Sequence, residues 1–283
     1  MVKRLAALTA ITIIVLNPNG LLAGTPSEVP AHPEIISNNQ VPNTPLTEIF
    51  EPSLTTTPIA KQPVNAAPLN GFRIDYSARY SAFTLDASLE LKKMAVADTY
   101  TYEATTKAHG LAKLFQSGTA RERSEFLYRK KSLRPILYTY SDGSNKKENG
   151  SRIAFDWPNR TARSVHETVS TELLLETEIH DRLSADLNSI IQLRNGQTPK
   201  EQVIAYRNSI RRYKMTALGK ETIDIPAGTF VTDKFLRQRI NSKRSTLIWF
   251  AKDADYLPVR IEQQKNGKTN VTMVATNIST NKQ

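Results

Sequence analysis

Alternating apolar and polar side chains dominate the chain from residue 72 onward. The first run places its apolar residues on one face: Phe72, Ile74, Tyr76, Ala78, Tyr80 and Ala82. This period of two is typical of a half-buried β-strand. The phase then changes, and the next apolar set is Phe83, Leu85, Ala87, Leu89 and Leu91. The change predicts a β-bulge or a sharp bend near Ala82 and Phe83. A third strand is predicted over Tyr100, Tyr102, Ala104 and Thr106.

Turn residues predict three hairpins farther along the chain. Pro226 and Gly228 favour a tight turn that leads from Ile223 and Ile225 back through Phe230. A second turn is expected at Pro158-Asn159. Asn266-Gly267 suits a two-residue type I′ turn. That turn predicts the pairs Val259 with Val274, Ile261 with Thr272, and Leu257 with Thr276.

The strongest helical pattern lies in residues 180–196. Leu183, Leu187, Ile190 and Ile191 share one helical face, and Gly196 supplies a stop. We expect this helix to lie on the sheet or to plug one end of a barrel. A shorter helix is predicted over residues 110–118. The fold class is therefore mainly β: a curved antiparallel sheet, or a partial or closed β-barrel, with one or two short helices.

The N-terminus carries the pattern of a secretory signal peptide over residues 1–24. Lys3 and Arg4 precede an apolar run from Leu5 to Leu16. That run is shorter than the roughly 20 residues that span a bilayer. We therefore expect cleavage, export and a periplasmic location. Thr25 stands where a lipoprotein would carry its acylated cysteine, and the chain has no cysteine, so we do not expect a lipoprotein.

Residues 25–70 form a predicted disordered, proline-rich tether. They hold nine of the fifteen prolines and show neither helical nor strand periodicity. A partner protein that binds a proline motif in this tether stays an open alternative. Residues 71–283 are then expected to form a single β-rich domain, long enough for one hydrophobic core.

The net charge of +11 is concentrated in this β-rich domain. Residues 1–24 carry +2 and residues 25–70 carry −3, which leaves +12 for residues 71–283. A basic surface predicts contact with anions. Because an exported chain meets lipopolysaccharide phosphates, lipid head groups or peptidoglycan carboxylates first, we do not expect a nucleic-acid partner. A merely solvated basic face is the alternative.

The sequence contains no recognisable catalytic or cofactor motif. It has no nucleophile elbow, phosphate loop or dinucleotide fingerprint. Its four histidines, His32, His109, His166 and His180, lack the spacing that places two imidazoles on one face. We interpret His180-Asp181 as a helix start rather than as part of a metal site. No catalytic residue, metal or cofactor is therefore predicted.

Three segments of the C-terminal half resemble a known family. They read DRLSADLNSIIQLR, then GKETIDIPAGTFVTDKF, then LIWFAKDADYLPVRIEQQKNGK. In this order they resemble the exported bacterial family of domain of unknown function 3108, over roughly residues 71–278. The resemblance implies an exported β-rich module and assigns no catalytic residue. By fold-level analogy, such curved sheets resemble periplasmic carriers that shield acyl chains.

These observations favour a non-enzymatic periplasmic module that binds an amphiphilic or anionic envelope component, such as a lipid, lipopolysaccharide or a lipoprotein acyl chain. Tyr76, Tyr80, Tyr100 and Tyr102 are the expected lining of its concave side. Arg237 and Arg239 are expected to meet the head group, and they share one face with Lys243 if residues 235–243 form a strand. The first alternative is a structural or protein-interaction module of the envelope, and the less favoured one is a hydrolase of envelope polymers.

Three residues near the last hairpin are interpreted as structural residues at a corner, against the alternative of a binding platform: Trp249, Tyr256 and Pro258.

Overall fold

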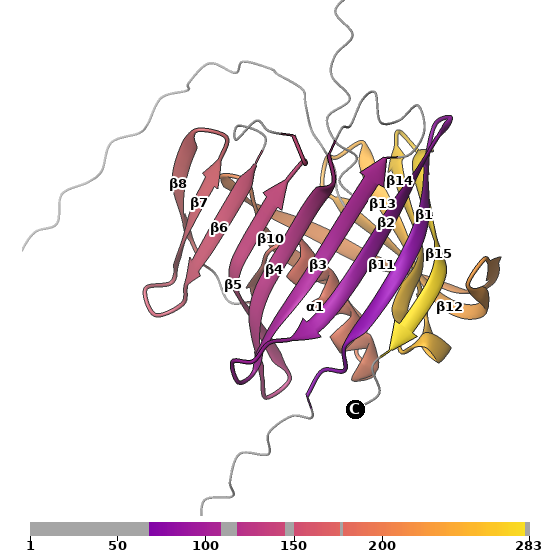
Figure 1. The fold of residues 1–283 in the computed structure, drawn as a ribbon, viewed down its shortest axis with the longest axis horizontal. Helices are drawn as coiled ribbons and strands as arrows, with labels where there is room; N and C mark the ends of the chain where they lie inside the picture. Colours follow the sequence, from indigo (N-terminus) through magenta and orange to yellow (C-terminus); the bar gives the residue numbers. More distant parts are fainter. Residues whose placement is uncertain (1–67, 109–117, 145–149, 176–177, 281–283) are drawn as a thin grey trace, which may run out of the picture. The chain divides into compact units, whose positions relative to one another are not determined.

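A computed structural model describes residues 68–108, 118–144, 150–175 and 178–280. These residues form one sheet of fifteen strands with a single α-helix. Figure 1 shows how the sheet and α1 are arranged. The strands of the first half are β1 (Phe72–Tyr80), β2 (Phe83–Lys93), β3 (Thr99–Ala108), β4 (Ala120–Arg129), β5 (Ser132–Ser141), β6 (Ser151–Asp156), β7 (Thr161–His166), β8 (Val169–Leu174) and β9 (Ile179–His180). After helix α1 (Arg182–Arg194) come β10 (Glu201–Tyr206), β11 (Ser209–Ile225), β12 (Gly228–Arg239), β13 (Arg244–Ala251), a 3₁₀ turn η3 (Lys252–Ala254), β14 (Leu257–Lys265) and β15 (Lys268–Thr280).

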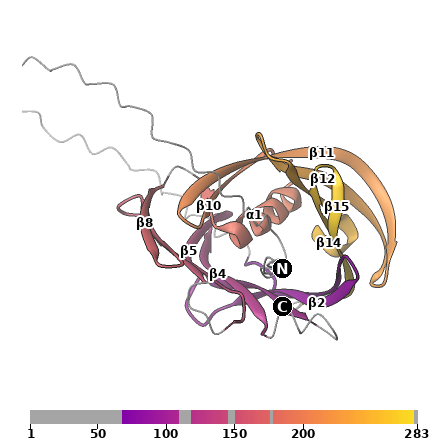
Figure 2. The same ribbon diagram turned by 90° about the horizontal axis from the view of Figure 1, so that it is seen from above.

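The sheet consists of two meanders joined through the first and last strands. Its order is β8-β7-β6-β5-β4-β3-β2-β1-β15-β14-β13-β12-β11-β10-β9. Neighbours pair antiparallel except β9 and β10, which run parallel and align Ile179 with Val203. The sheet is open and strongly curved, with α1 inside the curve (Figure 2). The predicted fold class, a mainly β protein built on a curved antiparallel sheet, is confirmed.

The two ends of the sheet approach each other through side chains. A buried apolar cluster joins Tyr138, Ile153 and Leu173 of the β5–β8 end to Ile179 and Ala205 of the β9–β10 end. The Ser164 hydroxyl of β7 also donates to the carbonyl of Arg207, which follows β10. Packing thus brings the two ends together without a continuous hydrogen-bond ladder, so the β-barrel is only partial.

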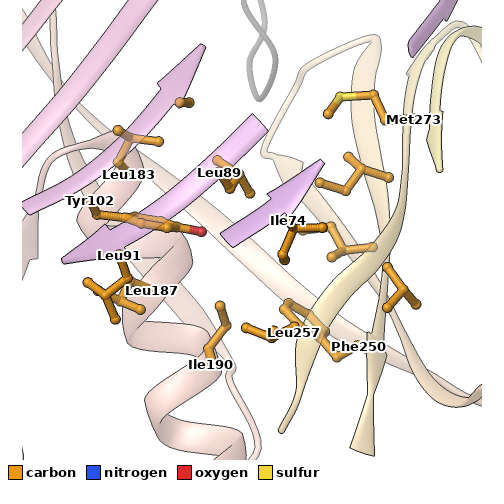
Figure 3. Packing of buried hydrophobic residues seen from close by; sticks show 14 of the residues in the cluster. Ile74, Leu89, Leu91, Tyr102, Leu183, Leu187, Ile190, Phe250, Leu257 and Met273 are labelled. Carbon is orange, nitrogen blue, oxygen red and sulfur yellow. The ribbon is translucent and has the colours of Figure 1, made fainter. Parts of the chain in front are cut away.

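Helix α1 fills the space enclosed by the sheet. Leu183, Leu187 and Ile190 lie against the inward apolar residues of several strands, among them Leu89 and Tyr102 (Figure 3). Each fully buried leucine or isoleucine contributes roughly 2 kcal/mol of hydrophobic stabilisation. The interior of the curved sheet is therefore a packed hydrophobic core.

The sequence also explains where α1 begins. Asp181 is its N-cap, and the Asp181 carboxylate accepts from the backbone N–H of Ser184 at 2.9 Å. The Ser184 hydroxyl accepts from the backbone N–H of Asp181 at 2.9 Å, which completes a capping box. The interpretation of His180-Asp181 as a helix start is confirmed.

The predicted bulge near Ala82 and Phe83 is wrong, because the chain turns back there. β1 and β2 are antiparallel neighbours, and Tyr80 pairs with Phe83 across a two-residue turn in which Ser81 has φ 53°. Two residues paired across such a turn lie on the same face although their numbers differ by three. The apolar set therefore moves from even to odd numbers without any inserted residue.

The last hairpin has the predicted turn and a different register. Asn266 and Gly267 have φ of 52° and 73°, as a type I′ turn requires. A bulge then places one extra residue, Asn270, in β15, so Ile261 pairs with Met273 rather than with Thr272. The predicted pairs of Val259 and Leu257 are not formed, because the paired part of β14 and β15 begins at Arg260 and Val274. The bulge brings Val271, Met273 and Ala275 to the buried face.

The remaining elements follow the turn chemistry. Ile223 pairs with Phe230 around the turn at Pro226, and β6 and β7 are joined through residues 157–160, which confirms both predicted hairpins. The short helix predicted for residues 110–118 falls almost wholly on residues 109–117, outside the described part. The predicted signal peptide and most of the predicted tether lie outside it as well. Among the described residues, no helix is long and apolar enough to cross a membrane.

Candidate functional site

The structure places three of the four predicted tyrosines in the hydrophobic core. Tyr76, Tyr100 and Tyr102 are buried, whereas Tyr80 is half-buried at the end of β1. The Tyr76 hydroxyl donates to the carbonyl of Pro258 at 2.6 Å, and the Tyr100 hydroxyl accepts from the backbone N–H of Leu69 at 3.2 Å. Burial raises the pKa of the Tyr76 and Tyr102 phenols. A ligand cannot reach Tyr76 or Tyr102 in this conformation.

The two predicted head-group arginines differ in position. Arg237 lies inside the sheet, where its guanidinium donates to the Asp186 carboxylate of α1 and lies 3.4 Å from the Gln202 side-chain oxygen. Arg239 is half-buried at the end of β12. Because β12 ends at Arg239, the expected extension of this face to Lys243 is wrong. Arg237 thus anchors α1, and its side chain is not available at the surface.

A second buried ion pair holds the start of α1. Arg182 donates to Glu122 Oε2 of β4 at 3.0 Å, and the Tyr138 hydroxyl of β5 donates to Glu122 Oε1 at 2.8 Å. Burial raises the pKa of Glu122, and Arg182 opposes that rise. The Ser124 hydroxyl donates to the Asp181 carboxylate at 2.6 Å. The hydrogen bonds of these buried groups therefore hold the start of α1 against β4 and β5.

Trp249 also has a structural position. It is 2% exposed, its indole N–H donates to Glu221 at 3.0 Å, and its ring lies between Lys234 and Arg260. A buried indole with these partners presents no open aromatic face to a ligand.

The candidate site is a pocket of about 690 Å³ alongside α1. It lies where the β4–β5 turn, the β6–β7 turn and the chain before α1 meet the C-terminal half of the helix. The lining residues are Lys131, Ser132, Leu133, Arg134, Trp157, Arg160, Glu178, Ile179, His180, Asn188, Ile191, Gln192, Asn195 and Gln197. This volume is within the usual range of roughly 300–1,000 Å³ for small-molecule sites.

Three exposed cations lie around this pocket. Lys131 is the second residue of a two-residue turn, Arg134 follows on β5, and Arg160 ends the β6–β7 turn. None of the three forms an ion pair with a described residue, and Glu178 is the one acid among the residues that line the pocket. The Arg134 guanidinium lies 5.6 Å from the ring centre of Trp157, whose N–H donates to the Pro135 carbonyl at 2.7 Å. The local charge is therefore positive.

The deeper part of the pocket has uncommitted hydrogen-bonding groups. His180 is 5% exposed, and its Nδ1 has no hydrogen-bond partner. Burial lowers the pKa of His180 to about 4, so the ring is neutral at pH 7. Asn188 and Gln192 lie one helical turn apart, are half-buried, and line the same pocket.

A smaller pocket of about 220 Å³ adjoins the first. Both pockets include Lys131, Ile191 and Asn195, so they form neighbouring parts of one depression along α1. Leu69 and Tyr128 add apolar surface to the smaller pocket. The combined site offers cations, amides and apolar patches close together.

The described residues contain no group of three or more His, Cys, Asp or Glu side chains placed to hold a metal ion. His180 is buried beside α1, and His166 lies at the end of β7, with its Nδ1 3.2 Å from the Gly150 carbonyl. His109 lies outside the described residues.

Sequence reasoning missed the residues of this pocket as a group. Among these residues, only His180 was named from the sequence, as part of a helix start. The available signal was their placement at turns and helix ends, because such positions gather at the rim of a curved sheet.

One family and several solved structures are similar to this chain. The family described as "Protein of unknown function (DUF3108)" matches residues 72–274. A search of curated proteins finds no match. A β-barrel-like protein of domain of unknown function DUF1849 from Brucella abortus is similar with a TM-score of 0.46 and 8% identity, covering 76% of this chain and 99% of that one.

Two further solved structures are similar at lower scores. One, from Bacteroides fragilis, is described as an exported protein with a YmcC-like fold, with a TM-score of 0.31, 10% identity, and coverage of 75% of this chain and 97% of that one. The other is described as a lipoprotein from Parabacteroides distasonis, with a TM-score of 0.32, 11% identity, and the same two coverages of 75% and 97%.

Proposed function

Because the chain belongs to the DUF3108 family, whose description states no activity, we propose a function from the pocket itself. The protein is an exported, non-enzymatic module that binds an anionic amphiphile of the cell envelope. The bound molecule places its charged head group among Lys131, Arg134 and Arg160. Its apolar part contacts the depression beside Ile191, Leu69 and Tyr128.

The observation that carries this proposal is the set of three cations without ion-pair partners around a partly apolar pocket. Lysine and arginine side chains near an anionic lipid surface each contribute about 1 kcal/mol to binding. Three of them therefore supply about 3 kcal/mol, or roughly a hundredfold in affinity. The net positive charge of the chain also speeds the encounter with an anionic surface.

Export is supported by the N-terminal pattern, in which Lys3 and Arg4 precede a short apolar run. The proposal that the module is not an enzyme is supported by the structural roles of its buried acids. Glu122 and Asp186 are each paired with an arginine, and Asp181 caps α1. These acids hold the helix in place and do not face the pocket.

Vesicle flotation with the purified full-length chain tests the proposal. We expect binding to vesicles that contain phosphatidylglycerol or lipopolysaccharide, and much weaker binding to pure phosphatidylcholine. The triple variant Lys131→Gln, Arg134→Gln, Arg160→Gln should bind anionic vesicles about a hundredfold more weakly.

A matched control removes the same charge elsewhere. Lys220, Lys265 and Lys268 are exposed and lie outside the pocket, so their combined replacement by Gln should leave most of the affinity. Equal losses in the two triple variants would show that the chain responds only to its total charge. The proposal would then be abandoned, as it would be if the native chain bound phosphatidylcholine equally well.

A further inference from the structure

The larger pocket is polar at its floor as well as at its mouth, and we propose that it recognises a phosphorylated sugar. This inference rests on the proposed function and names the head group of its ligand. The phosphate meets Lys131, Arg134 and Arg160, while the sugar hydroxyls bind to Asn188 and Gln192. The acyl part of such a ligand, where it has one, stays outside this pocket.

The composition of the lining argues against an acyl chain within the larger pocket. Ten of the fourteen lining residues are polar or charged, and the apolar ones are Leu133, Trp157, Ile179 and Ile191. The space enclosed by the sheet is filled by α1 and by core residues such as Leu183, Leu187 and Tyr102 (Figure 3). An acyl chain would therefore leave many polar groups of the pocket without water or partners, which is unfavourable.

The uncommitted groups in the floor match hydroxyl groups. A side-chain amide offers both donors and an acceptor, and a hydroxyl can satisfy either. Asn188 and Gln192 present two such amides one helical turn apart, with no side-chain hydrogen bond to a described residue.

The mouth matches a phosphate ester. A guanidinium group binds a phosphate through two parallel hydrogen bonds, and an ammonium group adds a point charge. Arg134 on β5 and Arg160 in the β6–β7 turn are exposed, and Lys131 stands three residues before Arg134 in the sequence. Glu178 is an acceptor for a sugar hydroxyl and disfavours a second negative group at its position.

Isothermal titration calorimetry with the full-length chain tests the inference. The ligands are N-acetylglucosamine 1-phosphate, N-acetylglucosamine, inorganic phosphate and decyl phosphate. We expect the sugar phosphate to bind at least tenfold more tightly than each of the other three, because it alone fills the cationic mouth and the polar floor.

Variants then locate the sugar. The double variant Asn188→Ala, Gln192→Ala should weaken binding of the sugar phosphate at least fivefold and leave the affinity for inorganic phosphate unchanged. The control double variant Asn270→Ala, Asn277→Ala removes two exposed amides of β15 and should bind like the native chain. Circular dichroism and thermal melting confirm that each variant is folded.

The possible results separate the inference from the proposed function. If decyl phosphate binds as tightly as the sugar phosphate, or if only anionic vesicles bind, the inference is overturned while the proposed function stands. If neither phosphate ester nor any anionic vesicle binds, both fall. Equal loss in the two double variants would also overturn the inference.

A last comparison distinguishes a lipid head group from a free sugar phosphate. Vesicles that contain lipid A display a phosphorylated sugar on a membrane. For an envelope ligand we expect these vesicles to bind more tightly than the free sugar phosphate and to be displaced by it. If the free sugar phosphate displaces the vesicles but the vesicles do not bind more tightly than it does, the ligand is the free compound. The sugar-phosphate site is then still supported.

Discussion

Arg182 at the start of α1 donates to Glu122 of β4 at 3.0 Å, and this ion pair joins segments 60 residues apart in the sequence. Both side chains are almost fully buried, with 4% and 3% exposure. Removing one partner of a buried ion pair leaves a desolvated charge and costs roughly 3–5 kcal/mol. The pair therefore fixes the helix inside the sheet.

We expect Glu122→Gln to lower the free energy of unfolding by about 3 kcal/mol or more, because Arg182 stays charged without its partner. Glu122→Leu combined with Arg182→Met should cost less than either single change. Denaturant unfolding at pH 7 measures both. Asp75→Asn is the control, since its exposed pair with Arg73 contributes less than about 1 kcal/mol. A double variant as unstable as the sum of its single variants would contradict this account.

Tyr76 and Tyr102 allow a comparison of two buried tyrosine hydroxyls, one with a hydrogen-bond partner and one without. The hydroxyl of Tyr76 donates to the Pro258 carbonyl, whereas the hydroxyl of Tyr102 is buried without a partner. We expect Tyr76→Phe to cost about 1 kcal/mol and Tyr102→Phe to be neutral or stabilising. Thermal melting of the two variants gives the comparison. A larger loss for Tyr102→Phe would mean that its hydroxyl has a partner in solution, such as a buried water.

Arg237 and Arg239 test the interpretation that both arginines meet a head group. Arg237→Gln leaves Asp186 buried without its ion-pair partner, so we expect a loss of roughly 3–5 kcal/mol in the free energy of unfolding. Arg239→Gln at the end of β12 should change stability by less than about 0.5 kcal/mol. Urea titration of both variants decides the matter. Equal stabilities would show that Arg237 is not an anchor of α1.

Local patterns predicted three of the hairpins and the alternation of the first three strands, because alternation and turn residues act over a few neighbours. The Asn266-Gly267 turn is an example, since its positive φ angles follow from these two residues alone. The register beyond it was not predictable. The bulge at Asn270 keeps Val271 and Met273 facing the core, and that requirement comes from residues packed from other strands.

The candidate site was not predictable as a unit. Lys131, Trp157, His180 and Asn188 come from two different turns, a short strand and a helix. Curvature of the whole sheet brings them together, and this curvature cannot be predicted from the spacing of these residues in the sequence. The predicted tyrosines had the correct inward direction, but sequence periodicity does not reveal that α1 fills the space they face.

His180 predicts a specific dependence of stability on pH. Burial lowers its pKa from 6.5 to about 4, so below pH 6.5 the unfolded chain binds a proton that the folded chain does not bind until about pH 4. The titration of His180 therefore leaves the free energy of unfolding unchanged above pH 6.5 and lowers it by about 3 kcal/mol as the pH falls to 4.

His180→Phe removes this titration and isolates it. We expect the variant to gain stability relative to the native chain as the pH is lowered from 7 to 4.5. Glu122, Asp181 and Asp186 have raised pKa values and titrate with the opposite sign, but they do so in both proteins. Unfolding curves at pH 7, 5.5 and 4.5 give the difference. A difference that is constant with pH would show that the ring is solvated.

Lys130 and Lys131 allow the sharpest test of the pocket. Both occupy the two-residue β4–β5 turn with positive φ, at 50° and 64°, and both are exposed. Replacement by glycine relieves the left-handed strain of about 1 kcal/mol in either case, partly offset by the greater freedom of the unfolded chain. The two variants also lose the same charge, so their stabilities and net charges should match.

Only Lys131 lines the pocket, and the two variants should therefore differ in binding. We expect Lys131→Gly to weaken binding to anionic vesicles about fivefold, which corresponds to the contribution of one cation near an anionic surface. Lys130→Gly should retain nearly the native affinity. Flotation at low and at physiological salt measures both, because screening shortens the range of any effect of Lys130. If the two glycine variants lose affinity equally at physiological salt, the anion binds to the turn as a whole and not in the pocket.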